Sequence, residues 1–158
     1  IYLRAQPSEE IESQYIAYIE SKGFSCTPEK ATRVVSLLAD RVTFFTDYWN
    51  LGRYFFVEPS EYDEQMARKK WNPEVAAILK LFAQGLSSDL LKNAEDLKQS
   101  LWEIANDNGS GIGKVMPGLR LALVGYGGGP DIVDIMQVLG VSETKHRIQT
   151  AIEKLTEL

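Results

Sequence analysis

The sequence predicts an all-α fold, and three observations support this prediction. Apolar residues recur at helical spacing in one segment after another, as Ile11, Tyr15 and Ile19 illustrate. Capping residues followed by proline or acidic residues precede several of these segments. No two strand-like segments are joined by a hairpin signal. We therefore expect helices packed on helices around an apolar core.

The first predicted helices have recognisable start and stop signals. Ser8 is a candidate N-cap with acidic residues behind it, and Gly23 stands where a C-cap glycine belongs. Thr27-Pro28 starts the next helix. The aromatic segment 44–56 would allow a strand, but its alternation is poor and a helix is preferred. This helix either continues the preceding one or turns back after Asp40.

In the middle of the chain, Pro59-Ser60-Glu61 is predicted to cap a helix that runs through Ala67. Asn72-Pro73 opens a further helix that ends at Gly85. Helical periodicity stops in the polar patch from Gly85 to Asp89. The sequence therefore predicts two helical subdomains, residues 1–86 and 87–158.

Further helices are expected in the second subdomain. Residues 94–106 form a helix whose inward face is predicted to hold four apolar side chains, Leu97, Leu101, Trp102 and Ile104. A short apolar helix lies between Gly113 and Gly125 and carries Arg120 as its one charged side chain in mid-run. From the residues alone, Arg120 has two interpretations. It is an ion-pair partner or a solvated side chain at the edge of the helix, or it contacts a ligand. The last helix is expected after Ser142.

Composition narrows the possible functions. The 158 residues carry a net charge of -5, with a pI of about 5.0, so bulk positive charge does not drive nucleic-acid binding. The single cysteine, Cys26, excludes an internal disulfide and fits a reducing compartment. The sequence shows no signal peptide and no long apolar run, so we expect no membrane association. The first residue is Ile1, which suggests a piece of a longer chain.

Motifs for chemistry are incomplete. The segment from Gly109 to Lys114 resembles a phosphate loop, but the first glycine and the final Ser or Thr of that motif are missing. His146 is the only histidine and has no cysteine at ligand spacing, which argues against zinc. Carboxylate pairs such as Glu9 and Glu10 are explained by helix capping. We therefore expect no catalytic residues, no cofactor and no metal in this chain.

A succession of motifs near the end of the chain is more distinctive. It comprises Gly113-Lys-Val, Leu119-Arg-Leu-Ala-Leu-Val-Gly125, a glycine/proline loop, an apolar helix ending in Leu-Gly140, and a last helix with a basic residue before Ile148. This order resembles the end of bacterial-type glutamyl-tRNA synthetases. Upstream segments extend the resemblance to nearly the whole chain: Ala39-Asp-Arg-Val, Tyr54-Phe-Phe and Tyr62-Asp-Glu.

The resemblance implies two helical subdomains that form an anticodon-binding helix cage and bind a glutamate-accepting tRNA. In such a synthetase, ATP (with Mg) and glutamate are handled by an N-terminal Rossmann domain with His-Ile-Gly-His and Lys-Met-Ser-Lys-Ser type motifs, and neither motif occurs here. The expected setting is a cytoplasmic, monomeric glutamate-tRNA ligase that does not bind DNA. Whether that ligase also accepts the glutamine tRNA is left open.

The resemblance also assigns candidate RNA-binding residues. Arg41 matches an arginine that contacts the third anticodon base, a cytosine, in a loop where unpaired bases are accessible. The alternative is that Arg41 pairs with Asp40 or Asp47 on the surface. Arg120 matches an arginine that reaches the first anticodon base.

The remaining candidates are a loop and scattered basic side chains. Residues Gly129, Pro130 and Ile132 match the family's loop beside the first anticodon base. Arg33 and Lys114 are expected to contact phosphates. The basic run Arg68 to Lys70 is equally well explained by phosphate contact and by compensation of the helix dipole.

A rival hypothesis is an all-α protein-interaction module. In it, Trp49, Trp71 and Trp102 would anchor a partner helix. This hypothesis requires an exposed aromatic patch, whereas the tRNA hypothesis requires exposed arginines.

Overall fold

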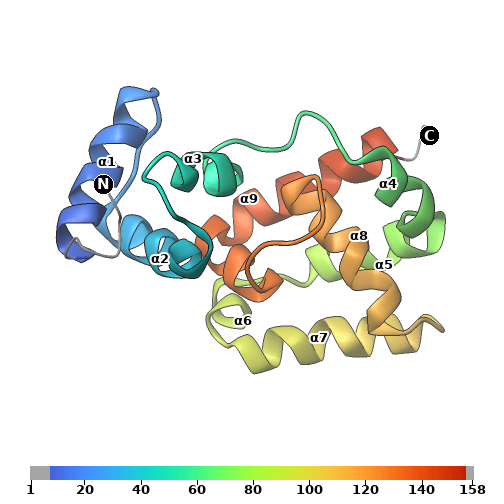
Figure 1. Cartoon of the computed structure of the whole chain (residues 1–158). Coiled ribbons are helices and arrows are strands. Elements are labelled where there is room, and N and C mark those ends of the chain that lie inside the picture. The colour runs from blue at the N-terminus through green and yellow to red at the C-terminus, as the bar shows by residue number, and fades with distance from the viewer. Residues whose placement is uncertain (1–7, 156–158) are drawn as a thin grey trace. The chain divides into compact units, whose positions relative to one another are not determined.

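The computed structural model describes residues 8–155, and every regular element within them is helical (Figure 1). The predicted all-α fold is confirmed. Two compact units make up the chain, one up to Val57 and the other from Glu58 onward.

Between residues 8 and 57, the first unit contains three α-helices and two 3-10 turns. Their bounds are α1 Ser8–Ser21, α2 Pro28–Leu38, η2 Ala39–Arg41, α3 Asp47–Gly52 and η3 Arg53–Phe55. Helix α2 contacts both α1 and α3. Its start is as predicted, because the Thr27 side chain accepts a hydrogen bond from the Lys30 N–H and Pro28 occupies the first turn. The aromatic segment forms a short helix after a turn, not a strand.

Aromatic rings contribute to the core of the first unit beside the aliphatic side chains of α1 and α2. Tyr15 is fully buried, with its ring centroid 5.7 Å from that of Tyr48. Tyr18 packs edge-on against Phe45 at 5.6 Å. Such edge-to-face pairs add to the free energy gained from burial. These contacts fix α1 against the segment that follows Arg41.

The second unit contains six helices in the described residues. They are α4 Glu64–Lys70, α5 Pro73–Gln84, α6 Ser88–Lys92, α7 Ala94–Asp107, α8 Ile112–Val124 and α9 Ile132–Leu155. Helix α8 contacts α4, α5, α7 and α9 and is therefore the centre of this unit. Its approach to α5 is close, because a Cβ on Gly118 would lie 2.5 Å from Val75 Cγ1. A larger residue at position 118 would separate the two helices.

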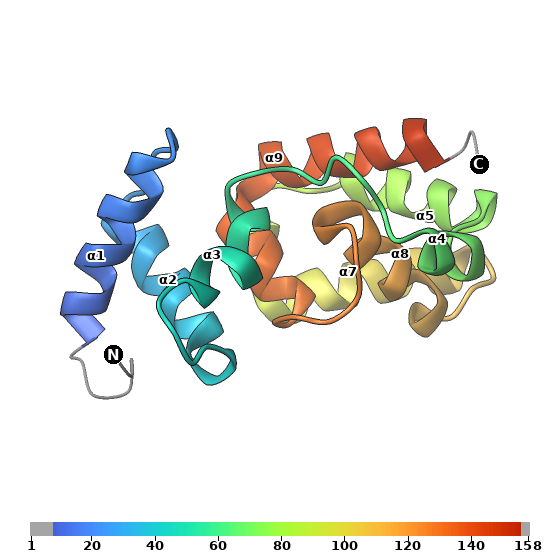
Figure 2. The same ribbon diagram turned by 45° about the horizontal axis from the view of Figure 1, so that its top comes forward.

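Two glycines set the ends of these central helices. Gly125 ends α8 with a φ of 94°, a left-handed conformation that glycine adopts without strain. Gly140 has a φ of 84° and a ψ of 170°, and it divides α9 into two helical parts whose change of direction can be followed in Figure 2. The last helix therefore begins near Ser142, as predicted.

Three expectations differ from the structure. Helix α4 begins at Glu64, because the Asp63 carboxylate accepts from the Met66 N–H and replaces the predicted cap at Pro59-Ser60-Glu61. Trp102 is 47% exposed and points outward from α7. The compact units divide at Val57 and Glu58 instead of at residues 86 and 87, because α5 packs on α7, α8 and α9.

Candidate nucleic-acid interface

Arg41 lies at the start of a tightly closed turn. It ends η2 and is exposed, while the next residue, Val42, is extended and buried. The backbone N–H groups of Thr43 and Phe44 both donate to Asp47 Oδ2, each at 2.9 Å. These two bonds lower the pKa of the Asp47 carboxyl. The turn 41–47 is therefore closed by Asp47.

The aromatic residues beside this turn point in different directions. Phe45 lies half-buried against Tyr18, whereas Phe44 is 55% exposed. Trp49 stacks on Phe24 at 6.0 Å between centroids, and Lys22 Nζ lies 4.6 Å from the Trp49 centroid. The half-buried Trp49 thus contributes to the fold of this unit.

The other basic residues of α2 differ in their roles. Arg33 is exposed on the face of α2 opposite to its buried residues. Lys30 instead donates to the Phe55 carbonyl at 2.7 Å, and its Nζ lies 4.2 Å from the Phe56 centroid. Lys30 therefore joins α2 to the end of this unit, whereas Arg33 is on the surface.

Arg120 is joined to the glycine/proline loop of the second unit. Its Nη1 donates to the Gly128 carbonyl at 2.8 Å. Gly128 and Gly129 have φ values of 87° and 99°, which favour glycine. The structure therefore brings Arg120 together with the loop at residues 125–131, which can be followed in Figure 1 between α8 and α9.

Two apolar residues at the end of this loop face the core. Pro130 is buried and Ile132 is only 2% exposed, so the Ile132 side chain offers no surface to a base in this conformation. Asp131 Oδ1 accepts from the Val133 N–H at 2.8 Å, and its Oδ2 lies 3.9 Å from Lys98 Nζ. The loop surface is thus supplied by Tyr126, which is 42% exposed, by the exposed Asp131 and by the glycine backbone from Gly127 to Gly129.

A buried arginine, which the sequence analysis noted in the family motif without giving it a role, supports the same loop. Arg147 on α9 is only 2% exposed. It donates from Nε to Glu143 Oε2 and from Nη1 to the Leu123 carbonyl, both at 2.8 Å. The second bond satisfies a carbonyl at the end of α8, immediately before the loop. The spacing of four residues between Glu143 and Arg147 could have predicted the ion pair, but it could not have predicted that Arg147 is buried.

Further basic residues are exposed. Lys114 lies in the first turn of α8. Arg68 ends α4 together with Lys69 and Lys70, and its Nη2 is 4.0 Å from Glu64 Oε2. Basic residues at the end of a helix compensate its dipole, and the exposed positions of the same residues suit contact with phosphates equally well.

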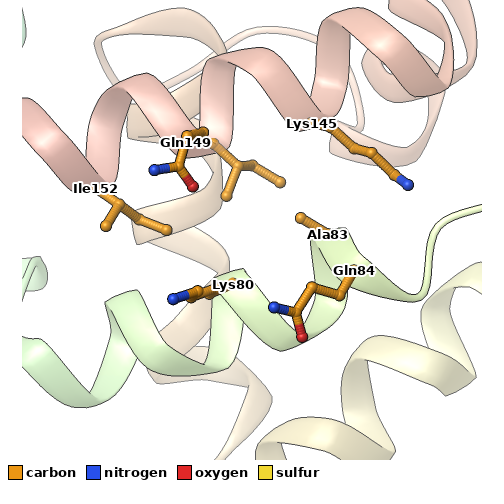
Figure 3. Close-up of a pocket in the computed structure, with 7 residues that line it drawn as sticks. Lys80, Ala83, Gln84, Lys145, Gln149 and Ile152 are labelled. Carbon is orange, nitrogen blue, oxygen red and sulfur yellow. The ribbon is translucent and has the colours of Figure 1, made fainter.

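A pocket of about 390 Å³ lies between α5 and α9 (Figure 3). Lys80 and Gln84 of α5 and Lys145 and Gln149 of α9 surround a small aliphatic floor. Its lining residues include no carboxylate, histidine or hydroxyl group. Its two lysines therefore have no carboxylate or histidine in the lining with which to form an acid–base pair.

Other features of the described residues concern metals and membranes. No group of three or more His, Cys, Asp or Glu within residues 8–155 is arranged to hold a metal ion. The Nε2 atom of His146 instead lies 2.7 Å from Glu58 Oε2. Burial raises the pKa of the Cys26 thiol, which disfavours the reactive thiolate. In the same residues, no helix is long and apolar enough to cross a membrane.

Comparison with known proteins identifies the class. Residues 8–152 match the family described as the anticodon binding domain, and the chain belongs to this family. The glutamate–tRNA ligase of Flavobacterium johnsoniae is 38% identical over 159 residues, which cover 98% of this chain and 30% of that protein. The ligase of the same name from Porphyromonas gingivalis W83 is 36% identical over 154 residues, with coverage of 98% and 30%.

Solved structures agree with these matches. The crystal structure of a glutamate tRNA ligase from Elizabethkingia meningosepticum, in complex with its amino acid, superposes with a TM-score of 0.87 and 37% identity over 97% of this chain and 30% of that one. The synthetase from Elizabethkingia anophelis gives 0.81 and 33%, with coverage of 96% and 29%. The chain thus spans about 30% of the length of these relatives. The resemblance to the anticodon-binding region of glutamyl-tRNA synthetases is confirmed.

Proposed function

We propose that this chain recognises the anticodon loop of a glutamate-accepting tRNA as one part of a glutamate–tRNA ligase. The observation that carries the proposal is the match to the anticodon binding domain family over residues 8–152. ATP, Mg²⁺ and glutamate would be bound by the part of the ligase outside this chain.

Arg41 is the residue that we assign to the third anticodon base. Cytosine offers O2 and N3 as acceptors on its exposed edge, and a guanidinium carries only donors. The exposed position of Arg41 and the closed turn behind it support this assignment, because a fixed backbone lowers the entropy lost on binding.

Arg120 has a different role in this proposal. Its hydrogen bond to Gly128 holds the loop at residues 125–131 in shape, so that Gly129 and backbone groups meet the first anticodon base. Arg33 and Lys114 contribute contacts to phosphates, which strengthen binding without selecting a sequence.

A binding titration tests the proposal. The chain is titrated with glutamate tRNA and with the same tRNA carrying guanine as its third anticodon base, at two salt concentrations. We expect the wild-type chain to bind the native tRNA more tightly. An Arg41→Ala variant should bind the native tRNA about tenfold more weakly, while its affinity for the guanine-substituted tRNA changes much less. The matched control Arg33→Ala should weaken both complexes equally. It should also reduce the slope of log affinity against log salt concentration by about one, which corresponds to the loss of one phosphate contact.

Two results would contradict the proposal. Equal affinity for both tRNAs in the wild-type chain would leave only attraction to the RNA backbone. Absence of binding even at low salt would favour a protein-interaction module, for which the exposed Trp102 is the first residue to test.

A further inference from the structure

The most exposed large apolar side chain in residues 8–155 lies in the same turn as Arg41. Phe44 is 55% exposed, against 38% to 47% for the other exposed large apolar residues. Its neighbour Phe45 packs edge-on against Tyr18 and Tyr48, at 5.6 Å and 6.0 Å between centroids. Two adjacent phenylalanines thus have opposite roles, because one closes the core and the other is presented to solvent.

The backbone under Phe44 is fixed. The Phe44 N–H donates to Asp47 Oδ2 at 2.9 Å, and the Phe44 carbonyl accepts from the Asp47 N–H at 3.0 Å. Val42, two residues earlier, has an extended backbone, and its buried side chain anchors the turn next to Arg41. The aromatic ring therefore projects from a rigid base, and little conformational freedom of the backbone is lost when a ligand covers it.

We propose that Phe44 is a stacking platform for an unpaired base of the RNA that contacts Arg41. This inference rests on the proposed function and adds a second contact residue to it. An unpaired base presents a flat π-face, and aromatic side chains bind such faces whatever the base. An arginine three residues away supplies hydrogen bonds to a base edge or a phosphate.

A protein partner is the less favoured occupant of this site. An apolar side chain from such a partner would cover the Phe44 ring, but the exposed basic residues Arg33 and Arg41 of the same unit suit an anionic ligand better. The exposed Asp40 lies beside Arg41, so the turn is not a uniformly basic patch. Stacking, which does not depend on net charge, suits this mixed setting.

The test uses the whole 158-residue chain with Phe44→Ala, Phe44→Tyr and the matched control Trp102→Ala, an exposed aromatic residue of the second unit. We expect Phe44→Ala to weaken binding about tenfold to both the native and the guanine-substituted tRNA, with their ratio unchanged. Phe44→Tyr keeps an aromatic face and should stay within about twofold, as should Trp102→Ala. The urea midpoints should not change, because the Phe44 side chain is largely exposed.

A fluorescent purine analogue, placed in turn at each unpaired position of the anticodon loop, gives a second measurement. Its emission should be quenched at one position by the wild-type chain and by Phe44→Tyr, but not by Phe44→Ala.

Failure of this inference can be distinguished from failure of the proposed function. If the wild-type chain prefers the native tRNA but Phe44→Ala binds as tightly, the stacking role is wrong and the anticodon function remains. Equal losses in Phe44→Ala and Phe44→Tyr, or in Phe44→Ala and Trp102→Ala, would also overturn it. Absence of any tRNA binding by the wild-type chain would overturn both.

Discussion

The turn at residues 41–47 and the loop at residues 125–131 each carry a candidate arginine, but they use it differently. In the turn, the closing hydrogen bonds come from Asp47, and Arg41 is exposed. In the loop, Arg120 itself donates to the Gly128 carbonyl, and Arg147 supports the end of the preceding helix. From this comparison we propose that base selection belongs to the first unit, whereas the arginines of the second unit maintain the shape of a loop.

The largest expected effect comes from removing the buried support of the loop. Arg147→Ala would leave the Leu123 carbonyl without its partner and open a cavity. We expect a loss of about 3 kcal/mol in the free energy of unfolding of the second unit. Urea unfolding followed by tryptophan fluorescence measures this change.

The control for this prediction is Arg68→Ala. Arg68 has the same spacing to Glu64 as Arg147 has to Glu143, but its pair is exposed and 4.0 Å long. Its loss should cost no more than about 0.5 kcal/mol. Equal effects of the two substitutions would mean that the burial of Arg147 has no energetic role in the second unit.

A smaller effect is expected at the glycine that starts the loop. Gly125 has a φ of 94°, and a Cβ there would lie 2.9 Å from the Glu61 carbonyl oxygen. Gly125→Ala should therefore destabilise the second unit by about 2 kcal/mol. Gly113→Ala is the matched control, because a Cβ there meets nothing within 4 Å, and it should be neutral or stabilising. A neutral Gly125→Ala would show that the loop tolerates a different path.

Arg120→Ala should loosen the loop without unfolding the chain. Loss of the bond to the Gly128 carbonyl removes roughly 1 kcal/mol of local stability, which corresponds to about fivefold faster amide exchange in residues 126–131. Amides of the turn at 41–47 should be unchanged. If hydrogen exchange in the loop is unaffected, Arg120 does not maintain its shape, and direct contact with a base becomes the better account.

The smallest effect is a pH dependence of the turn. Two backbone N–H groups lower the pKa of Asp47 below its ordinary value of about 3.9. Because the folded-state pKa is depressed, the contribution of Asp47 is present above the ordinary pKa and is lost as pH falls through the lower, folded value. The Thr43 and Phe44 amide resonances should shift together, with a midpoint below about 4. Asp40→Asn should leave that midpoint unchanged, and a midpoint above the ordinary value would contradict closure by Asp47.

Much of the fold could be predicted from local signals. Helix starts at Thr27-Pro28 and Asn72-Pro73 were predicted because both the cap and the proline act within one turn. The start of α4 was misplaced because the choice between Pro59-Ser60-Glu61 and Asp63 depends on a tertiary contact. The Asp63 N–H donates to the Gly125 carbonyl at 2.8 Å, and no sequence pattern reports that bond.

The candidate site could be predicted only in part. Family resemblance indicated Arg41 and Arg120, but not that Arg120 is bonded to the loop. Trp102 was expected to point inward because its spacing suits the buried face of α7. Leu97 and Leu101 fill that face, and Trp102 is left exposed. Phe44 and Phe45 are identical in type, so only the packing of the first unit decides which ring is presented to solvent.

The most direct test of this account compares two variants in one experiment. The affinities for native glutamate tRNA and for the tRNA with guanine as third anticodon base are measured for wild type, Arg41→Ala and Arg120→Ala. The account predicts that the preference for the native tRNA disappears in Arg41→Ala and is retained in Arg120→Ala, although the latter binds both tRNAs more weakly. An unchanged preference in Arg41→Ala would contradict the assignment of base selection to the first unit.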